Sequence, residues 1–367
     1  MATDPPVFRR LWIGTFPVAG IGTPAGRGEG IWHTRIDLAS GRLSPAVQAC
    51  RTPAPSFLAR VPGRDVLHAT GEASPEGVVT TWAVEGDALR PLSSIPSLGD
   101  SPTHVAVARG LLLACNYGDG TVLAVGLDED GLPRRPSHAL RHDGGGPVLG
   151  RQERSHAHSA TFTPDGATAL VCDLGTDELR RLRLRPPARP GAREDGVAFR
   201  FRPGSGPRHA AFRRGGRVLD VVTELSAELV TLTWDGESAA ETARRPAQVT
   251  TLGQEDLPSH VTPSADGRLL YVGNRGPGTI SVFALPDPAG GTALAGPAPL
   301  GEVPAGSAWP RHLAVVPGRG GREFIVVAGE QAGRLHVLVR DAAEALPRLL
   351  PEEFGTPVPS PAFVLPG

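Results

Sequence analysis

The sequence contains no lysine, so all 37 of its Lys-plus-Arg residues are arginines. This absence excludes enzymes that form a lysine Schiff base and proteins that hold nucleotides in a lysine-containing phosphate loop. The formal net charge of −1 offers no basic surface to nucleic acid. No apolar run reaches the length of about 20 residues that a membrane-spanning helix needs. Residues 1–10 also lack the apolar segment of a secretory signal.

Cysteine is scarce as well. The three cysteines, Cys50, Cys115 and Cys172, are odd in number and lack the spacing of a metal site. Cys115 and Cys172 occupy matching places in apolar stretches, where a free buried thiol behaves as a small apolar side chain. We therefore expect unpaired cysteines and a cytoplasmic protein.

Glycine and proline are abundant, with 47 and 38 residues, and a short phrase containing proline recurs along the chain. The phrase is Pro-x-His or a close variant, and it stands at residues 55–57, 102–104, 155–157, 207–209, 258–260, 310–312 and 361–363. Successive copies are 47, 53, 52, 51, 52 and 51 residues apart. A period of this length indicates a repeat architecture with seven units.

Each repeat predicts several short strands. An apolar strand opens on the phrase, and Val, Leu, Ile and Thr then predict a second and a third strand. The second strands are expected at residues 66–70, 111–115, 168–172, 218–223, 269–273 and 324–328. The third are expected at 78–84, 121–127, 178–184, 228–234, 279–285 and 334–339, with more polar fourth strands such as 89–95 and 139–142. Four antiparallel strands repeated seven times predict an all-β, seven-bladed β-propeller.

The two ends of the chain complement each other. Residues 11–16 and 30–37 read as a second and a third strand without a first, and residues 361–366 read as a first strand without successors. We therefore expect one propeller domain over residues 1–367, closed by pairing of the N- and C-terminal strands, which removes free sheet edges. A TIM barrel would need about eight amphipathic helices, and no stretch has their periodicity.

Polar residues that differ from blade to blade gather at one end of the predicted channel. The start of a first strand and the end of a second strand share one rim of an antiparallel hairpin. The first strands place there Ser56, Thr103, His156, Arg208, Ser259, Arg311 and Ala362. The second strands place there Glu72, Asn116, Asp173, Glu224, Asn274 with Arg275, and Gly329 with Glu330. This end of the channel is therefore the predicted site.

The histidines divide into two kinds. His104, His209, His260 and His312 share one repeat position, which Phe57 and Phe363 occupy in two other blades, so we expect them to be architectural. His156 and His158 have no counterpart, and their spacing of two puts both on one side of a strand. They are interpreted either as buried channel histidines or as catalytic groups. A His-x-His pair can also bind zinc, with a third ligand from Glu72, Asp173 or Glu224, which the spacing alone does not establish.

Glu224 is the strongest candidate for catalysis because it ends an apolar strand and enters a rim rich in arginine. Glu224 either forms a structural salt bridge with Arg208 or acts as a general base. In the second case His156 or His158 transfers the second proton. Arg208 and Arg275 could stabilise an oxyanion or bind a substrate carboxylate or phosphate. Further candidates for substrate binding at this rim are Arg151, Gln152, Arg311, Glu72, Asn116 and Asp173.

The sequence resembles the propeller-type lactonase family, which includes a bacterial 6-phosphogluconolactonase and the fungal 3-carboxy-cis,cis-muconate lactonizing enzyme. The resemblance runs nearly end to end and rests on residues 12–16, 55–58, 116–117, 151–152, 155–159, 173–175, 204–209, 224–225 and 274–276. It implies a functional set of His156 or His158, Arg208, Glu224 and Arg275. Ser155 stands where the family usually has proline, and residues 17–29 form a long, glycine-rich segment.

The resemblance and the rim together predict an enzyme that hydrolyses an anionic sugar lactone such as 6-phosphogluconolactone, without a cofactor or metal. Two alternatives stay open. An intramolecular cyclase or isomerase acting on a carboxylate would use the same groups, since lactonization is hydrolysis in reverse. A propeller can also serve as a scaffold that binds a partner without catalysis. The expected partner is a small anionic molecule rather than nucleic acid or a membrane, and the sequence does not indicate an oligomeric state.

Overall fold

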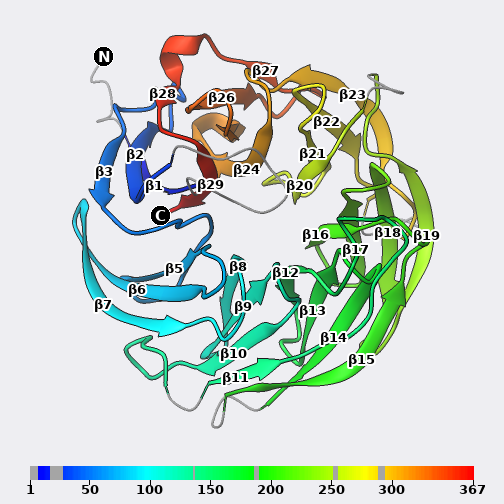
Figure 1. Cartoon of the computed structure of the whole chain (residues 1–367). Coiled ribbons are helices and arrows are strands. Elements are labelled where there is room, and N and C mark those ends of the chain that lie inside the picture. Colours follow the sequence, from blue (N-terminus) through cyan, green and yellow to red (C-terminus); the bar gives the residue numbers. More distant parts are fainter. Residues whose placement is uncertain (1–6, 17–27, 135–136, 186–189, 251–254, 288–293) are drawn as a thin grey trace, which may run out of the picture.

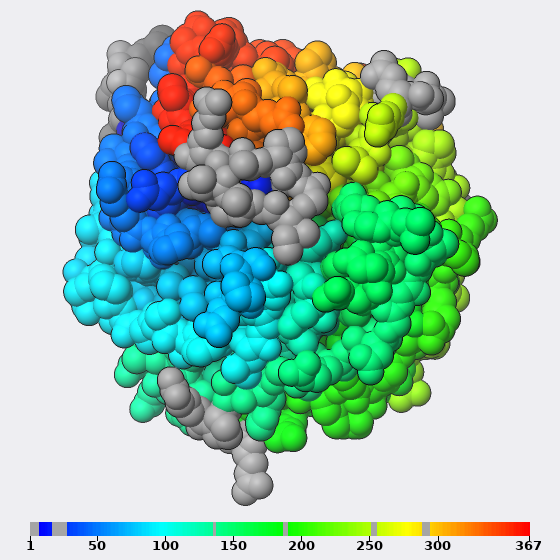
Figure 2. All heavy atoms as spheres, in the orientation of Figure 1, coloured from blue at the N-terminus to red at the C-terminus, as the bar shows by residue number. Residues whose placement is uncertain are grey.

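The computed structural model describes residues 7–16, 28–134, 137–185, 190–250, 255–287 and 294–367. They form seven antiparallel sheets arranged in a ring (Figure 1). We number these sheets as blades 1 to 7, and Figure 2 shows that the blades follow one another around the disc in chain order. Within the described residues, the only helices are two short 3-10 turns, and neither could cross a membrane.

Blade 1 contains strands from both ends of the chain, in the order β29-β1-β2-β3. Its strands are β29 (Pro361–Pro366), β1 (Phe8–Thr15), β2 (Ile31–Asp37) and β3 (Val47–Cys50). Gly14 pairs with Phe363, so the predicted closure is confirmed. The segment at residues 17–29, noted for its length, lies largely outside the described residues.

The other blades each use consecutive strands. Blade 2 comprises β4 (Leu58–Arg60), β5 (Val66–Gly71), β6 (Val78–Glu85) and β7 (Ala88–Pro96). Blade 3 comprises β8 (Pro102–Ala108), β9 (Leu111–Asn116), β10 (Val122–Gly126) and β11 (His138–Leu140). Blade 4 comprises β12 (Ala157–Phe162), β13 (Thr168–Asp173), β14 (Glu178–Leu184) and β15 (Ala192–Arg200).

Blade 5 comprises β16 (Pro207–Phe212), β17 (Val218–Thr223), β18 (Glu228–Trp234) and β19 (Ala239–Pro246). Blade 6 comprises β20 (Pro258–Pro263), β21 (Leu269–Asn274), β22 (Thr279–Ala284) and β23 (Ala298–Pro304). Blade 7 comprises β24 (Pro310–Pro317), β25 (Glu323–Gly329), β26 (Arg334–Arg340) and β27 (Arg348–Leu349). β28 (Thr356–Pro357) pairs with β26, and the two 3-10 turns are η1 (Arg319–Gly321) and η2 (Glu352–Phe354).

The first strands of neighbouring blades contact one another all the way around, so β29, β4, β8, β12, β16, β20 and β24 surround the central channel. An apolar cluster fills the space between each pair of adjacent blades. In the cluster between blades 7 and 1, Leu11 and Ile13 pack with Val326 and Val337. Each fully buried aliphatic side chain of this kind contributes about 1.5–3 kcal/mol. These clusters explain why the second strands are apolar on both faces.

The strand pairing corrects the predicted alignment in blade 4. In blade 5, Pro207 pairs with Thr223 and a bulge then contains Arg208. In blade 4, Ala157 pairs with Asp173 and the equivalent bulge contains His158. His158, not His156, therefore occupies the rim position of Arg208. The sequence alignment placed blade 4 two residues too early because Ser155 took the place of the missing proline.

Candidate active site at the mouth of the channel

The register defines which residues meet at the mouth. A backbone hydrogen bond links the residue after each second strand to a residue just before the first strand, as from Glu224 to Gly206, Glu72 to Ala54 and Leu174 to His156. From blade 1 to blade 7, the residue that directly follows the second strand is Phe16, Glu72, Tyr117, Leu174, Glu224, Arg275 and Glu330. Those in the first-strand position beside them are Ser56, Thr103, His158, Arg208, Ser259, Arg311 and Ala362. We call these fourteen residues the mouth ring.

Glu224 binds three arginines. Arg208 Nε donates to Oε2 at 2.7 Å, and Arg151 Nη2 donates to Oε1 at 2.5 Å. Arg275 Nη2 lies 2.6 Å from Oε2 as an ion pair, without an aligned hydrogen bond. Glu224, Arg208 and Arg275 are each buried, with at most 4% of their surface exposed, whereas the Arg151 side chain is 23% exposed. The predicted Arg208–Glu224 salt bridge is therefore one contact in a larger cluster.

The charges of this cluster act on each other. Burial opposes ionisation of Glu224, but the charges of Arg275, Arg208 and Arg151 outweigh it and hold its pKa well below the usual range. Burial, together with the neighbouring Arg275, lowers the pKa of Arg208 to about 9. Three guanidinium groups around one carboxylate leave a local excess of positive charge. Such a site suits an anion, because guanidinium binds carboxylates and phosphates through paired donors.

Both histidines of the His-x-His pair lie against Tyr117, which sequence reasoning missed. The His156 and Tyr117 rings stack with centroids 4.6 Å apart, and His158 meets the same ring edge-on at 5.6 Å. His156 Nδ1 donates to the Tyr117 carbonyl at 2.5 Å, and its Nε2 lies 3.3 Å from Glu153. Burial and the charge of Arg208 lower the pKa of His158 well below the usual range, so His158 is neutral at pH 7.

Several buried polar atoms of this cluster are without a hydrogen-bond partner among the described residues. They are Nδ1 of His158, Nε of Arg151 and Nη2 of Arg275. A buried polar atom without a partner costs about 1–3 kcal/mol. His158 Nδ1 and Arg151 Nε are therefore available to a ligand, whereas Arg275 Nη2 already faces Glu224 Oε2 at 2.6 Å as an ion pair.

The second side of the mouth holds Arg311, Glu330, Glu72 and Ser56. Arg311 Nη1 donates to Glu330 Oε2 at 3.0 Å, and its guanidinium lies 4.2 Å from the centroid of the Phe16 ring. Glu72 accepts a short hydrogen bond from Ser56. Two of the predicted substrate-binding residues, Arg311 and Glu72, therefore do face the mouth. Glu330 was aligned uncertainly from the sequence, and the register places it opposite Arg311.

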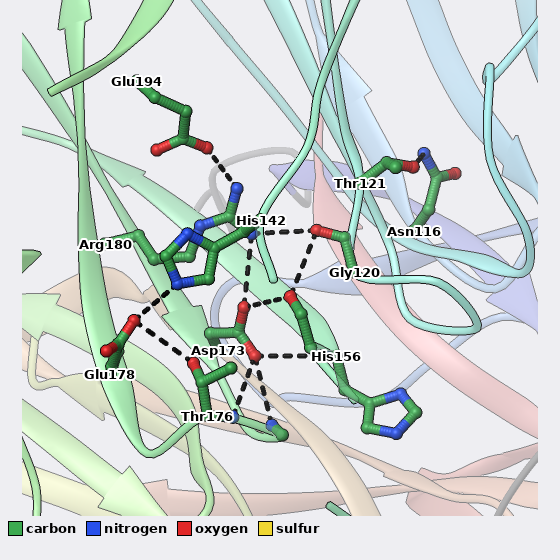
Figure 3. Close-up of polar contacts among 12 residues, drawn as sticks. Asn116, Gly120, Thr121, His142, His156, Asp173, Thr176, Glu178, Arg180 and Glu194 are labelled. Carbon is green, nitrogen blue, oxygen red and sulfur yellow. Dashed lines mark hydrogen bonds and ion pairs between the residues drawn. The ribbon is translucent and has the colours of Figure 1, made fainter. Parts of the chain in front are cut away.

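Two other predicted substrate-binding residues make their contacts inside the blades. Asp173 accepts hydrogen bonds from Ser155 and from the backbone of His156, and it pairs with Arg180, as Figure 3 shows. Asn116 donates to Thr121 and to the Ser97 carbonyl. Asn116 and Asp173 each lie one residue before the mouth ring, whereas sequence alignment put them level with Glu224. Their predicted contact with substrate has no geometric support.

Gln152 supports the segment that carries Arg151. Its Nε2 donates to the Leu174 carbonyl and to Asp177 Oδ1, both at 2.8 Å, and its Oε1 accepts from the Val148 backbone. These bonds anchor the segment that carries Arg151. Gln152 therefore holds the neighbouring arginine in place, and its side chain has no donor left for substrate.

The repeated histidines lie one residue further along the first strands. This inner ring consists of Phe57, His104, Ser159, His209, His260, His312 and Phe363. Their aromatic rings contact one another, for example His260 with His312 at 4.1 Å and Phe57 with Phe363 at 3.8 Å. Burial lowers the pKa of His104 and of His260 to about 3. The inner ring is therefore an uncharged packing layer. Among the described residues, no three His, Cys, Asp or Glu side chains are grouped so as to hold a metal ion.

Comparison with known proteins places these residues in a family. The model of the family described as "Lactonase, 7-bladed beta-propeller" matches residues 10–366, so the chain belongs to this lactonase family. The sequence is similar to a 6-phosphogluconolactonase of Bacillus subtilis, with 30% identity over 357 residues that cover 95% of this chain and 96% of that protein. The resemblance predicted from the sequence is thereby confirmed.

Two solved structures illustrate the relationship. The periplasmic gluconolactonase PpgL of Pseudomonas aeruginosa has 26% identity and a TM-score of 0.86, covering 98% of this chain and 99% of that one. A protein of Bacteroides fragilis described as a putative 6-phosphogluconolactonase has 21% identity and a TM-score of 0.83, covering 100% and 99%. The second likeness shows the fold alone. The roles of individual mouth residues stay predictions.

Proposed function

We propose that this protein is a hydrolase of anionic sugar lactones such as 6-phosphogluconolactone. The observation that carries the proposal is the cluster of Arg151, Arg208 and Arg275 around the buried carboxylate of Glu224. The cluster offers positive charge and, at Arg151 Nε, a buried donor that has no hydrogen-bond partner among the described residues. A lactone with a phosphate or carboxylate group needs such donors twice, once for the fixed anion and once for the oxyanion that forms when water attacks.

The neighbouring side chains supply a proton acceptor. A charged Glu224 with three arginines on its oxygens is a weak base, because each contact stabilises the ionised form. Burial and the charge of Arg208 lower the pKa of His158 and keep it neutral, the charge of Glu224 offsets this in part, and its Nδ1 is without a hydrogen-bond partner among the described residues. His158 therefore takes the proton of the attacking water, while Glu224 orients the arginines and stabilises the imidazolium. The role of general base, which the sequence assigned to Glu224, is thus shared: His158 accepts the proton and Glu224 stabilises the resulting charge.

His156 has a positioning role. Because its Nδ1 is bound to the Tyr117 carbonyl and its ring is stacked on Tyr117, it fixes the aromatic side chain against which His158 lies. The choice between His156 and His158, which the sequence leaves open, falls on His158.

The test is a pH-stat assay of the purified protein with a panel of lactones that includes 6-phosphogluconolactone, with and without EDTA. We expect hydrolysis above the spontaneous rate, insensitive to EDTA, and reduced about 10²- to 10⁴-fold in Glu224→Gln, because this change removes the charge that orients the arginines and stabilises the imidazolium of the general base. The matched control is Glu323→Gln. Glu323 is also a buried carboxylate and accepts hydrogen bonds from Arg340 and Tyr271 at 2.6 and 2.5 Å, but it lies in blade 7 away from the mouth ring.

The same assay separates the alternatives. If the folded protein hydrolyses no lactone in the panel, the proposed function is wrong. Incubation with hydroxy acids and unsaturated carboxylates, followed by NMR, then tests the cyclase. A scaffold would turn over neither set.

A cytoplasmic location is a further part of the proposal. It is supported by Cys50, Cys115 and Cys172, which are all free thiols. Cell fractionation tests the location, and recovery in the periplasm would contradict it.

A further inference from the structure

Glu72 is a buried carboxyl group that the mechanism above does not use. It follows β5 in blade 2, at the same position of the mouth ring that Glu224 occupies in blade 5. Only 6% of its surface is exposed. Glu72 and Glu224 therefore face one channel mouth from well-separated blades.

The surroundings of the two carboxyl groups differ. Glu72 accepts a short hydrogen bond from Ser56, and within the described part of the chain no arginine pairs with it. The charge of Arg311 acts on Glu72, but its Nη1 donates to Glu330 at 3.0 Å. Glu72 thus has no arginine paired with its carboxyl oxygens among the described residues, whereas Glu224 has three.

The charges facing Glu72 come from three elements. Burial raises its pKa to about 7, the charges of Arg311 and Arg208 and the Ser56 hydrogen bond oppose this rise, and Glu330 adds to it. Arg208 also binds Glu224, so a ligand held by Arg208 lies within the field of both carboxyl groups. Near neutral pH Glu72 exists in part as a neutral acid that can donate a proton.

We propose that Glu72 is a further catalytic residue of this site, the general acid that protonates the ring oxygen of the lactone as it leaves. The inference rests on the proposed lactone hydrolysis. It assigns the two sides of the mouth opposite tasks, with the base at Glu224 and His158 and the acid at Glu72.

In the proposed step the oxygen of water bonds to the acyl carbon, the second electron pair of the C=O bond moves onto the carbonyl oxygen, and His158 takes one proton from that water. The oxyanion then re-forms the C=O bond as the bond between the acyl carbon and the ring oxygen breaks, and the electron pair of that bond passes to the ring oxygen. Glu72 donates its proton to that oxygen, forming the hydroxyl group of the product. Glu72 regains a proton and His158 loses one, so that lactone and water give one hydroxy acid.

The experiment measures kcat/KM against pH between 5.5 and 9 for whichever lactone the wild-type protein hydrolyses, corrected for spontaneous hydrolysis. The acid must be protonated, so we expect the wild-type rate to fall as the pH rises through about 7, the pKa given above for Glu72. In Glu72→Gln, kcat/KM at pH 6 should be about 10²- to 10⁴-fold lower than in the wild type, and it should no longer fall as the pH rises.

Two neighbouring variants move the pKa without removing the acid. Glu330→Gln deletes a negative charge that raises the Glu72 pKa and releases Arg311, so the fall should shift to lower pH. Arg311→Gln deletes a positive charge that lowers this pKa, so the fall should shift to higher pH. A purely structural role of Glu72 would not produce opposite shifts. These variants also keep the proposal testable if Glu72→Gln does not fold.

The outcomes are distinct. Wild-type turnover with an unchanged rate or an unchanged pH profile in Glu72→Gln overturns this inference and leaves the hydrolase proposal intact. Profiles that do not move in opposite directions in Glu330→Gln and Arg311→Gln overturn it as well. Absence of any wild-type lactone turnover removes the hydrolase proposal itself. Loss of the fall in Glu72→Gln together with the two opposite shifts supports the acid role.

Discussion

Two neighbouring layers of the channel follow different rules. The mouth ring changes from blade to blade, and its first-strand position holds arginine in two blades, histidine in one and small residues in the others. The inner ring, one residue further along the same strands, holds histidine or phenylalanine in six blades. The strand pairing of each layer repeats from blade to blade, so the difference between the layers lies in their side chains. The repeated side chains pack the blades together, and the side chains that vary form the proposed site.

The largest expected effect is on the inner ring and appears on acidification. An unfolded histidine takes up a proton below pH 6.5, but the folded His104 and His260, with pKa values of about 3, do not. Their stabilising contribution is complete above pH 6.5 and falls by about 1.4 kcal/mol per pH unit for each histidine as the pH is lowered. His158, His209 and His312 have pKa values lowered in the same direction. We expect urea unfolding to require far less denaturant at pH 5.5 than at pH 7.5.

The matched variant for this effect is His260→Phe, because phenylalanine occupies the same position at Phe57 and Phe363. It should reduce the dependence of the free energy of unfolding on pH by about 1.4 kcal/mol per unit. Its lactone turnover at pH 7.5 should match the wild type. An unchanged pH dependence would mean that the inner ring is not held neutral.

The next largest effect concerns the stability supplied by Glu224. Replacing it with glutamine leaves buried arginines facing one another, and loss of one partner of a buried ion pair costs about 3–5 kcal/mol. The free energy of unfolding of Glu224→Gln at pH 7.5, from urea titrations, should fall by this amount. A variant as stable as the wild type would show that the arginines repel one another less than the geometry implies.

Glu72 should behave in the opposite way. Its pKa is raised to about 7, so the folded protein holds a proton there that the unfolded chain has lost. Stability from this group is complete below about pH 4.5 and is lost as the pH rises through 7, a loss of about 3 kcal/mol. Glu72→Gln should therefore be at least as stable as the wild type at pH 8. A destabilised Glu72→Gln at pH 8 would place Glu72 in an ion pair resembling that of Glu224.

The smallest effect is expected at Arg151, the most exposed member of the Glu224 cluster. Partly exposed ion pairs stabilise proteins by about 1 kcal/mol or less. The free energy of unfolding of Arg151→Gln should therefore be close to that of the wild type. The KM for an anionic lactone should rise about tenfold, which corresponds to one charge-assisted hydrogen bond of about 1.5 kcal/mol. Steady-state kinetics with a lactone lacking the fixed anion provide the control. An equal rise in KM for both substrates would show that Arg151 does not bind the anion.

The fold was predictable because the repeat contains its own signals. The second strand of blade 5 was predicted at residues 218–223 and is found as β17 (Val218–Thr223). Other boundaries differ by a few residues, as for β1, which begins at Phe8 rather than at residue 11. Apolar runs predict the second strands well, since burial between two blades requires apolar side chains on both faces.

The site was predictable only in part. Arg208, Glu224 and Arg275 meet as expected, but the bulge at the start of each first strand sets two residues against one and hides the register from the sequence. The error in blade 4 exchanged His156 for His158, and a similar shift exchanged Tyr117 for Asn116. The pairing of Arg311 with Glu330 within blade 7 depends on side-chain conformation, which no sequence pattern encodes. Tyr117 directly follows Asn116, so correct register is the signal that would have found it.

The pairing of β1 with β29 also delays completion of blade 1 while the chain is being synthesised. A ribosome adds about 5–20 residues per second, so β1 waits on the order of half a minute for the strand that completes its sheet. During that interval Leu11 and Ile13 lack the layer that buries them, and the blades already made cannot close into a ring. A chain stopped before residue 361 should be cut within blade 1 by a protease that spares the full chain. β29 therefore decides when the whole ring becomes stable, and each molecule is most vulnerable until β29 has been synthesised.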